Sequence, residues 1–365
     1  MKSQRELRDE LDMDSSWKGK ELPWVSVVVL NYNGDPVVYY CVDSLLKSNY
    51  PNLEIIIIDN ASTDRSYDKL KEKFGAHNNI IFHQNERNEG YPSYNRGAHL
   101  SRGDYIVFLN NDTEVHPDWL KEIVDVMESD LTIGACESKI VDKFIPNTVI
   151  NPGPCDFCGI QNRTMEKDVG QYSEVREIFS TIGVASTLRR SVLRVTGMLD
   201  PEFFLFEEIN DLCWRIWLAG YRVVYVPKSI IIHIGRIGHA PTYYPFELKV
   251  LSAYQSTKNH TLMLLKNYSL KNLVKCFMVL YVLRMGEFFF LLMKNHRIAV
   301  AKLNAYKWLL LNFRGIWTSR LRVQKNVRCV SEAEIERHLT NPNFSILLHR
   351  YSALVRSYKD SSYDK

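Results

Sequence analysis

The sequence predicts an α/β fold in which helices cover both faces of a central sheet, and three observations carry this prediction. Unbroken runs of mostly β-branched residues recur in the first third of the chain, the segments between them carry apolar residues at helical spacing, and polar residues follow the runs directly. Strand, helix and strand in succession favour right-handed βαβ units. With 365 residues, 45% of them hydrophobic, the chain can form one large or two ordinary domains and is not predominantly disordered.

The expected elements follow one another in a simple order. Residues 25–30 (VSVVVL) and 53–59 (LEIIIID) lack polar alternation, as do strands that are covered on both faces. Residues 36–49 between them have the spacing of a helix. A short strand at 80–83, a helix at 92–100 and a third buried strand at 105–109 (YIVFL) come next.

Polar residues follow three of these strands. The chain reads Asn-Tyr-Asn-Gly at 31–34, Asp-Asn-Ala-Ser-Thr-Asp at 59–64 and Asn-Asn-Asp at 110–112. Any one of these segments is explained by turn and capping preferences alone. Three successive strand ends of this kind favour a binding crevice, because ligands of such sheets bind beyond the carboxyl ends of the strands.

The first strand is not followed by a glycine-rich phosphate loop of the GxGxxG or Walker A type. This disfavours a Rossmann dehydrogenase and a P-loop enzyme. An Asp with Asn neighbours after a central strand suits a hard divalent cation that bridges a diphosphate through oxygen ligands.

Together these segments resemble glycosyltransferase family 2, whose members have the GT-A fold and use nucleotide-diphosphate sugars. The likeness covers roughly residues 23–235, and its motifs are VSVVVLNYNG, IIIIDNASTDRS and NEGYPSYNRGAHLSRGDYIVFLNND. The resemblance implies a mixed, nucleotide-binding sheet flanked by helices. It also implies that Asp59 contacts the nucleobase and that Asp112 is the main carboxylate ligand of Mn²⁺ or Mg²⁺, since Asn110 stands where the family has its first acid. The other implied donor-site residues, for a UDP or dTDP sugar, are Asn31, Tyr32, Asn33, Asn88, Gly90, Asn95, Asn110 and Asn111.

A later block, GMLDPEFFLFEE followed by DLCWRIWLAGYRVVYVPKSIIIH, resembles the family segment that carries the catalytic base. The family reads Glu-Asp-x-Asp or Glu-Glu-x-Asp before Leu-Cys-Trp-Arg, whereas this chain reads Glu-Glu-Ile-Asn-Asp at 207–211. An ungapped alignment puts Ile209 at the base position, and Ile cannot accept a proton. With one inserted residue, Glu208 is the base and Glu207 its reserve. Asp211 then orients or binds the acceptor, and Asn210 caps the helix.

The resemblance also assigns roles to a histidine and two arginines. His233 ends a strand at 230–232 and is implied to be a metal ligand or a diphosphate contact, with His239 as a substitute. Arg189 and Arg190 resemble the family's paired arginines; either one of them reaches phosphate or both are a solvated pair.

The cysteines favour a reducing compartment and no metal site. There are seven of them without regular spacing, and the CxxC at 155–158 has no second pair at zinc spacing. The stretch 151–172 around it is expected to be an irregular loop or hairpin near the acceptor side.

Charge divides the chain into regions. Residues 1–241 hold 26 basic and 35 acidic residues, and residues 242–365 hold 20 basic and 7 acidic ones. The expected organisation is a charged lead-in at 1–22, the catalytic domain at 23–240, a basic and aromatic helical region at 241–345 and a polar tail at 346–365. The lead-in has no signal peptide, which predicts a cytoplasmic protein.

The helical region raises the question of a partner. It lacks a nucleic-acid-binding module, so nucleic acid is not expected. Residues 273–293 are long enough to span a bilayer, but Lys275, Arg284 and Glu287 make a lone spanning helix costly. Arg284 lies half a turn from Lys275, so a flat interfacial helix has no clean face either. The expectation is a hairpin packed partly on the catalytic domain and partly on anionic lipid, with Trp308 and Trp317 at the headgroups. A plain helical subdomain or a homodimer interface is the alternative.

These observations lead to an expected activity. The leading hypothesis is an inverting, metal-dependent glycosyltransferase at the cytoplasmic membrane face, with a lipid-linked or polysaccharide acceptor. The alternatives are a polyprenyl-phosphate sugar synthase, which needs no base, and a catalytically impaired membrane-bound scaffold that binds nucleotide sugars.

Overall fold

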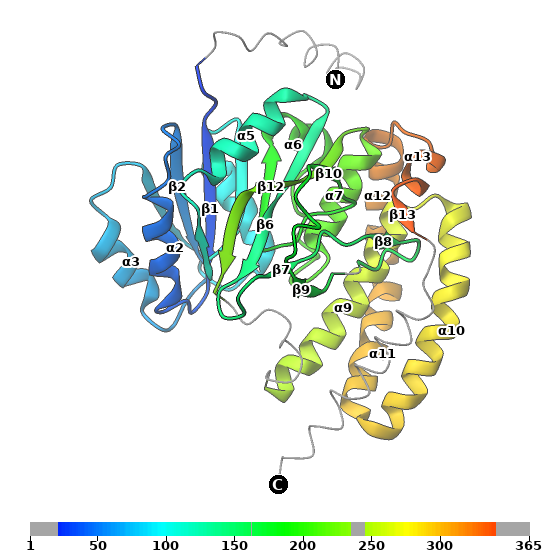
Figure 1. The fold of residues 1–365 in the computed structure, drawn as a ribbon. Coiled ribbons are helices and arrows are strands. Elements are labelled where there is room, and N and C mark those ends of the chain that lie inside the picture. The colour runs from blue at the N-terminus through cyan, green and yellow to red at the C-terminus, as the bar shows by residue number, and fades with distance from the viewer. Residues whose placement is uncertain (1–20, 162, 235–244, 341–365) are drawn as a thin grey trace.

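The β-branched runs form the centre of a mixed sheet with helices on both faces, and further helices stand beside this unit (Figure 1). The computed structural model describes residues 21–161, 163–234 and 245–340. The expected lead-in therefore lies almost wholly outside the described residues, and the expected tail lies entirely outside them. The α/β class and the helical C-terminal region are confirmed.

The sheet has the strand order β10-β12-β6-β11-β4-β1-β2-β3. Its centre is parallel, because β1 pairs with both β2 and β4 in that sense and β2 pairs with β3. It is mixed because β11 runs antiparallel to β4 and β6. The strands are β1 (Val25–Asn31), β2 (Leu53–Asp59), β3 (Ile80–Gln84), β4 (Tyr105–Asn110), β5 (Thr113–Val115), β6 (Ile133–Asp142), β7 (Thr148–Ile150), β8 (Cys155–Asp156), β9 (Met165–Lys167), β10 (Arg176–Glu177), β11 (Ala185–Arg189), β12 (Arg222–His233) and β13 (Leu339–Thr340).

Helices connect the strands and continue after them. The expected helix at 36–49 is shorter than predicted and ends at Leu45, and the one at 92–100 begins as a 3₁₀ turn, Tyr91–Ser93. The helices are α2 (Val37–Leu45), α3 (Ser66–Phe74), α4 (Tyr94–Leu100), α5 (Trp119–Ser129), α6 (Arg190–Thr196), α7 (Glu208–Leu218), α9 (Phe246–Asn267), α10 (Leu270–Lys294), α11 (His296–Leu311), α12 (Phe313–Arg322) and α13 (Glu332–Glu336).

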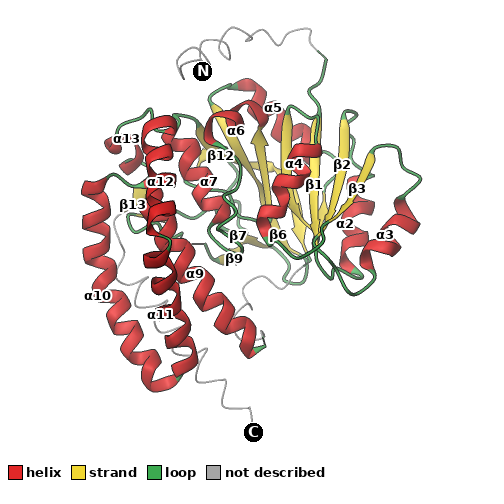
Figure 2. Ribbon diagram, turned by 180° about the vertical axis from the view of Figure 1, so that it is seen from behind, coloured by secondary structure: helices red, strands yellow, loops and turns green. Residues whose placement is uncertain are grey.

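Two hydrophobic cores lie on the two faces of the sheet. Val28 of β1 and Ile56 of β2 belong to the core that includes α4 and α7, whereas Val27 and Ile55 belong to the one that includes α2 and α5. This alternation follows from the two-residue period of a strand. Seen from behind, α4 lies over β1 (Figure 2).

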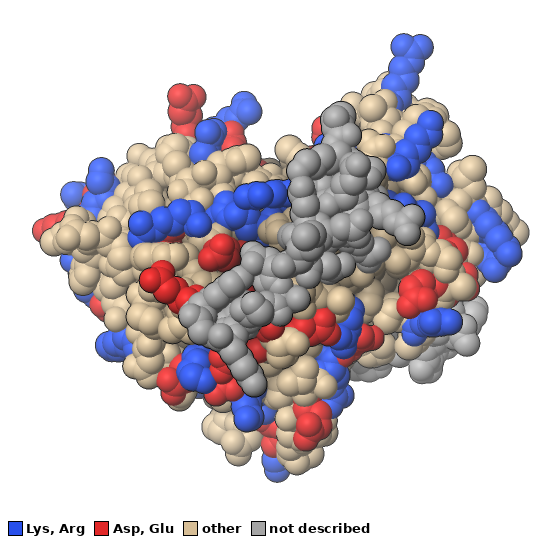
Figure 3. Space-filling model, turned by 90° about the horizontal axis from the view of Figure 1, so that it is seen from above, with Lys and Arg blue, Asp and Glu red and all other residues tan. Residues whose placement is uncertain are grey.

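Strand register brings the polar strand ends together. Asn31 is the register partner of Asp59, and Leu30 is the partner of Asn110. The predicted convergence of the three polar segments at one edge of the sheet is therefore confirmed. At the opposite edge, where β1 begins, basic and acidic side chains are interspersed (Figure 3).

The C-terminal helices pack on the sheet unit through α9, which contacts α7 as well as α11 and α12. Among the described residues, α10 is the one helix whose length and composition would allow it to cross a membrane, and 17% of its apolar window is buried. Of the two expected headgroup residues, Trp317 is exposed, but Trp308 is partly buried and lies under the Lys258 ammonium at 4.7 Å.

Candidate active site

Asn31 and Asp59 form the centre of a hydrogen-bond network at the carboxyl ends of β1 and β2. Asn31 Nδ2 donates to Asp59 Oδ2 at 2.8 Å and to Ser66 Oγ at 2.8 Å, and both central residues are buried. Asp59 Oδ1 accepts from the Ser62 N–H at 2.9 Å and from Gln84 Nε2 at 3.0 Å. Asp59 thus ties the ends of β1 and β3 to the loop after β2, and its expected nucleobase contact stays a prediction.

The loops after β1 and β2 are joined through Asn33. Its N–H donates to Ser62 Oγ at 2.9 Å, and its Oδ1 accepts from the Thr63 N–H at 2.7 Å. Asn33 has a φ of 51°, a left-handed conformation that Asn adopts more readily than most residues. Tyr32 beside it is half exposed and is available to a ligand at this edge.

Asn60 organises the donor-side block, although no motif singled it out. Asn60 Nδ2 donates to Asn88 Oδ1 at 2.8 Å and to the Gly90 carbonyl at 3.1 Å. Its Oδ1 accepts from Asn85 Nδ2 at 3.1 Å and from Ser93 Oγ at 2.9 Å. The signal that could have found it is its place directly after a buried strand.

Gly90 brings this block against the segment that precedes the two glutamates. Its φ is 71°, and a Cβ at this position would lie 2.0 Å from the Phe204 carbonyl oxygen. The Tyr91 N–H donates to the same oxygen at 3.0 Å. Close approach of the two backbones therefore requires glycine.

Asn95 makes different contacts from those expected. Its Nδ2 donates to the Leu199 carbonyl at 2.7 Å, and its Oδ1 accepts from the Leu199 N–H at 3.1 Å. Both polar atoms of the side chain thus fasten α4 to the segment at 199, and the donor-site role of Asn95 stays a prediction.

Asn110, Asn111 and Asp112 at the end of β4 have three different environments. Asn110 Oδ1 accepts from the Tyr94 hydroxyl at 3.2 Å, and Asn111 Nδ2 donates to Asn31 Oδ1 at 3.1 Å. Asp112 Oδ1 is buried and accepts no hydrogen bond from the residues that the structure describes. An unsatisfied buried carboxylate oxygen calls for a partner.

Asp112 Oδ1 lies 3.4 Å from His233 Nε2. The antiparallel pairing of β5 with β12 brings these two residues together, since Thr113 is the register partner of His233. Neighbouring oxygen ligands of an octahedral ion at ~2.1 Å are about 3 Å apart, so this oxygen and nitrogen fit two positions on one Mn²⁺ or Mg²⁺. No cluster of three His, Cys, Asp or Glu occurs in the described ranges. A diphosphate and water would supply the other ligands. His239 lies outside the described residues.

A cavity of about 300 Å³ lies beside Asn110. It brings a predicted donor-site residue together with both candidate bases. The lining residues are Tyr91, Asn110, Gln161, Thr181, Ile182, Gly183, Val184, Leu205, Phe206, Glu207, Glu208, Ile209 and Asn210.

Glu208 is buried in the wall of this cavity. Its Oε2 has no hydrogen-bond partner among the described residues. Burial, together with the neighbouring Glu207 carboxylate, raises the pKa of Glu208 to about 8. A carboxyl group in this state is a far stronger base, once ionised, than an exposed glutamate.

The prediction that Asn210 caps α7 is wrong. The helix begins at Glu208, and Glu207 is the capping residue, with φ of 68°; Phe206 before it has φ of 70°. Two successive residues in the left-handed region are strained, and such strain commonly accompanies functional sites.

Asn210 instead holds the Glu207 side chain. Asn210 Nδ2 donates to Glu207 Oε2 at 2.6 Å. Gln161 Nε2 and Ser180 Oγ each donate to Asn210 Oδ1 at 2.8 Å. The amide is therefore oriented by both partners, and it presents Glu207 to the cavity in one position.

Asp211, expected to be an orienting or acceptor-binding group, contacts α9 and not the cavity. It is fully buried, lies 2.9 Å from Arg215 and 3.1 Å from Lys266, and accepts from Asn267 Nδ2 at 2.9 Å. Burial opposes ionisation, but Lys266 and Arg215 outweigh it and hold the pKa of Asp211 below its ordinary value. Asp211 thus links α7 to α9 and does not line the cavity.

The paired arginines are also structural. Arg189 donates to the Ile133 carbonyl at 3.0 Å and to the Tyr105 hydroxyl at 2.9 Å, and Arg190 Nη2 donates to Ser101 Oγ at 2.6 Å. These partners lie where β4 and β6 begin, away from the polar strand ends, so neither arginine takes the expected phosphate role.

The stretch 151–172 is more ordered than expected. It contains β8 and β9, and β8 pairs with β13 from the C-terminal region. Cys155 and Cys158 are buried, as are four of the other five cysteines, whereas Cys329 is exposed.

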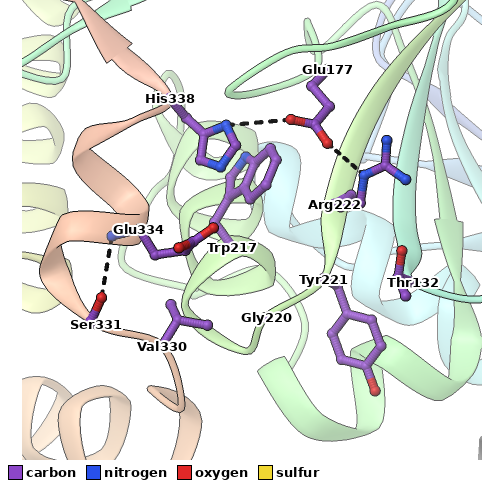
Figure 4. Close-up of a pocket in the computed structure, with 10 residues that line it drawn as sticks. All are labelled: Thr132, Glu177, Trp217, Gly220, Tyr221, Arg222, Val330, Ser331, Glu334 and His338. Atoms are coloured by element: carbon purple, nitrogen blue, oxygen red, sulfur yellow. Dashed lines mark hydrogen bonds and ion pairs between the residues drawn. The ribbon is translucent and has the colours of Figure 1, made fainter.

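A second cavity of about 460 Å³ lies where β12 begins, at the edge opposite the polar strand ends (Figure 4). The His338 ring stacks on Trp217 with the centroids 3.8 Å apart. Glu177 pairs with His338 at 3.6 Å and with Arg222 at 2.5 Å. The ion pairs of Glu177 with His338 and Arg222 thus join the C-terminal segment to the sheet.

Comparisons with known proteins agree with this geometry. Residues 26–197 match the family model of glycosyl transferase family 2. A glucosyl-dolichyl phosphate glucuronosyltransferase of Haloferax volcanii is 26% identical over 227 residues, which are 57% of this chain and 68% of that protein. Several other curated relatives are matched over less than half of their own length.

Solved structures show the same fold. The crystal structure of GalNAc-T7 with UDP, GalNAc and Mn²⁺ has a TM-score of 0.51 and 19% identity, over 65% of this chain and 51% of that one. The mannosyltransferase PcManGT of Pyrobaculum calidifontis, in complex with GDP-Man and Mn²⁺, has a TM-score of 0.50 and 14% identity, over 87% and 92% of the two chains. At these identities the likeness concerns the fold alone, which is GT-A.

Proposed function

Since this chain carries a glycosyl transferase family 2 domain on a GT-A fold, we propose that it is an inverting, metal-dependent glycosyltransferase. It moves a sugar from a nucleotide diphosphate, UDP or dTDP, to a hydroxyl of a lipid-linked or polysaccharide acceptor at the cytoplasmic membrane face. The observation that carries the proposal is that one cavity is lined by Asn110, Glu207 and Glu208 together. Asn110 lies two residues before Asp112 of the Asp112–His233 pair.

Asp112 and His233 would hold the divalent cation, which neutralises charge on the leaving diphosphate when it is bound. The chain's own residues shape the donor side around it. Asn31 and Asp59 order the loops after β1 and β2, and Asn60 orders the block at 88–93. These are rigid contacts made before the donor arrives, so less conformational freedom is lost on binding.

Glu208 is assigned as the base. Its Oε2 takes the proton of the acceptor hydroxyl, the acceptor oxygen forms a bond to the anomeric carbon, and the bond from that carbon to the diphosphate oxygen breaks. The pKa of about 8 supports this choice, because proton transfer is most efficient when the base is matched to the working pH. Attack opposite the leaving group inverts the anomeric carbon.

Glu207 is assigned to the acceptor. Asn210 fixes one of its oxygens, and Glu207 stands at the N-terminus of α7. It is therefore suited to accept a hydrogen bond from a second acceptor hydroxyl. The lipid-linked class of acceptor is supported by the dolichyl phosphate in the name of the Haloferax relative.

A transfer assay tests the proposal. UDP- and dTDP-sugars are offered with Mn²⁺ and a lipid extract, and release of nucleoside diphosphate is followed. We expect Glu208→Gln to lower the rate at least about 100-fold. Glu174→Gln, an exposed acid, is the control and should leave it unchanged. If Glu207→Gln abolishes transfer and Glu208→Gln does not, Glu207 is the base instead of Glu208. Full activity in both variants, with sugar on a lipid phosphate, would identify a polyprenyl-phosphate sugar synthase.

A further inference from the structure

The outer face of α10 is apolar along most of its length. Its exposed residues from 278 to 293 carry no charge, and lysines flank them at both ends. This apolar stripe spans about 22 Å at the rise of an α-helix. Its members are Met278, Tyr281, Val282, Gly286, Phe289, Leu292 and Met293, and the exposed flanking lysines are Lys271, Lys275 and Lys294.

The two charges that appeared to spoil this face are turned away from it. Glu287 lies 3.2 Å from Arg284 and 2.9 Å from Lys302 of α11, and Glu287 and Lys302 are both largely buried. A helical wheel cannot reveal this arrangement, because Lys302 belongs to the next helix. The ion pairs are satisfied inside the protein, so the outer stripe stays free of charge.

The inner face of α10 is already covered by protein. Leu273, Cys276 and Leu280 belong to the core that includes α7, and Leu291 packs with Ile298 of α11. A helix with one face in a protein core cannot cross a bilayer with lipid on all sides. The stripe can only be covered from outside, by something that lies against the helix.

Two partners could cover the stripe, a second copy of this chain or a lipid surface, and charge favours the lipid surface. The described helices α9 to α12 hold two acidic residues, and both are paired: Glu247 with Arg297 at 2.8 Å, and Glu287 as above. A second copy of this face would therefore bring exposed lysines against lysines. An anionic phospholipid surface offers the complementary charge to the lysines and hydrocarbon to the stripe.

We propose that the apolar stripe of α10 lies in the plane of an anionic bilayer, with Lys271, Lys275 and Lys294 at its headgroups. This contact goes beyond the transfer reaction. The lipid contact itself does not depend on the proposed function. Only its consequence does, which is that a lipid-linked acceptor would meet the enzyme at the membrane surface. Contact through one stripe is peripheral and reversible.

Flotation with vesicles tests the contact on the full-length chain. One set of vesicles contains about 70% phosphatidylcholine and about 30% phosphatidylglycerol, whose anionic headgroups give the surface a negative potential. The other set contains phosphatidylcholine alone. The test variant is Met278→Glu with Phe289→Glu. The matched control, Val169→Glu with Val175→Glu, adds the same charge at exposed positions of the sheet unit.

We expect the wild type and the control to float with the anionic vesicles and the test variant to bind at least tenfold more weakly. Equal binding of the two variants, or no binding by the wild type, would overturn the proposal. So would a wild-type dimer in sedimentation that the test variant dissociates. Thermal unfolding of both variants checks that they are folded. Nucleotide titration tests the proposed transferase function separately, because vesicle binding without nucleotide binding would refute that function and leave the lipid contact standing.

Discussion

Replacing Glu208 by Gln should stabilise the protein at neutral pH. The native fold keeps this carboxyl neutral up to a pKa of about 8, whereas its ordinary value is 4.5. Above pH 4.5 the unfolded chain ionises Glu208 and the folded chain does not, so wild-type stability falls as the pH rises toward 8. Glutamine has the same shape and no charge to suppress.

The size of the effect follows from the two pKa values. Each tenfold change in proton affinity corresponds to about 1.4 kcal/mol, so Glu208→Gln should gain less than about 1 kcal/mol at pH 5 and about 3 kcal/mol at pH 7. The gain should level off above pH 8.

Urea unfolding of both proteins, followed by tryptophan fluorescence from pH 4 to 8, measures this difference. Glu174→Gln serves as the exposed control and should show no pH-dependent gain. A constant difference between Glu208→Gln and wild type across this range, or a less stable variant at pH 7, would refute the assignment of a buried, neutral carboxyl.

Three further predictions concern the reaction, the α7–α9 link and Gly90. For transfer catalysed by Glu208, kcat/KM should rise about tenfold per pH unit below pH 8; a flat profile would contradict base catalysis. Asp211→Asn should lower the free energy of unfolding by about 3–5 kcal/mol, because Lys266 and Arg215 lose their buried partner; a denaturation curve like that of wild type would show that the cluster contributes little. Gly90→Ala should cost more than about 2 kcal/mol through the clash with Phe204. Gly170→Ala, also at positive φ but in open space, isolates the clash; equal losses in the two variants would contradict it.

Local sequence patterns predict the central parallel strands but not the strands whose burial depends on distant partners. β1, β2 and β4 were predictable because their β-branched runs are unbroken. β6 was not, because Glu137 lies inside it and pairs with Arg163 at 2.7 Å. Burial of that charge depends on a partner 26 residues away, which no periodicity reports.

The site divides in the same way. Strand-end chemistry was enough to predict Asn31, Asp59 and Asp112, since register alone brings the strand ends together. The roles of Asn60 and Asn210 depend on side chains elsewhere in the chain, Asn88 and Ser93 for Asn60 and Gln161 and Ser180 for Asn210. The motif around Asp211 predicted a role in the reaction. Its side chain instead accepts hydrogen bonds from Lys266 and Asn267, which lie 55 and 56 residues further along the chain.

The C-terminal helical region shows most clearly what local sequence patterns cannot predict. From the sequence, Lys275, Arg284 and Glu287 argued against a spanning helix, and Arg284, half a turn from Lys275, argued against a clean apolar face on α10. The pairing of Glu287 with Arg284 and with Lys302 removes the second objection. Whether a charge lies at the surface or in an ion pair is decided by tertiary packing and not by helical spacing.

The central claim is tested most directly by calorimetric titration of UDP, dTDP and GDP into the protein with and without Mn²⁺. We expect that at least one of them binds, that Mn²⁺ strengthens the binding, and that Asp112→Asn abolishes the Mn²⁺ dependence while Asp125→Asn, an exposed acid on α5, does not. Binding of none of the three, or Mn²⁺ dependence that survives Asp112→Asn, would contradict it.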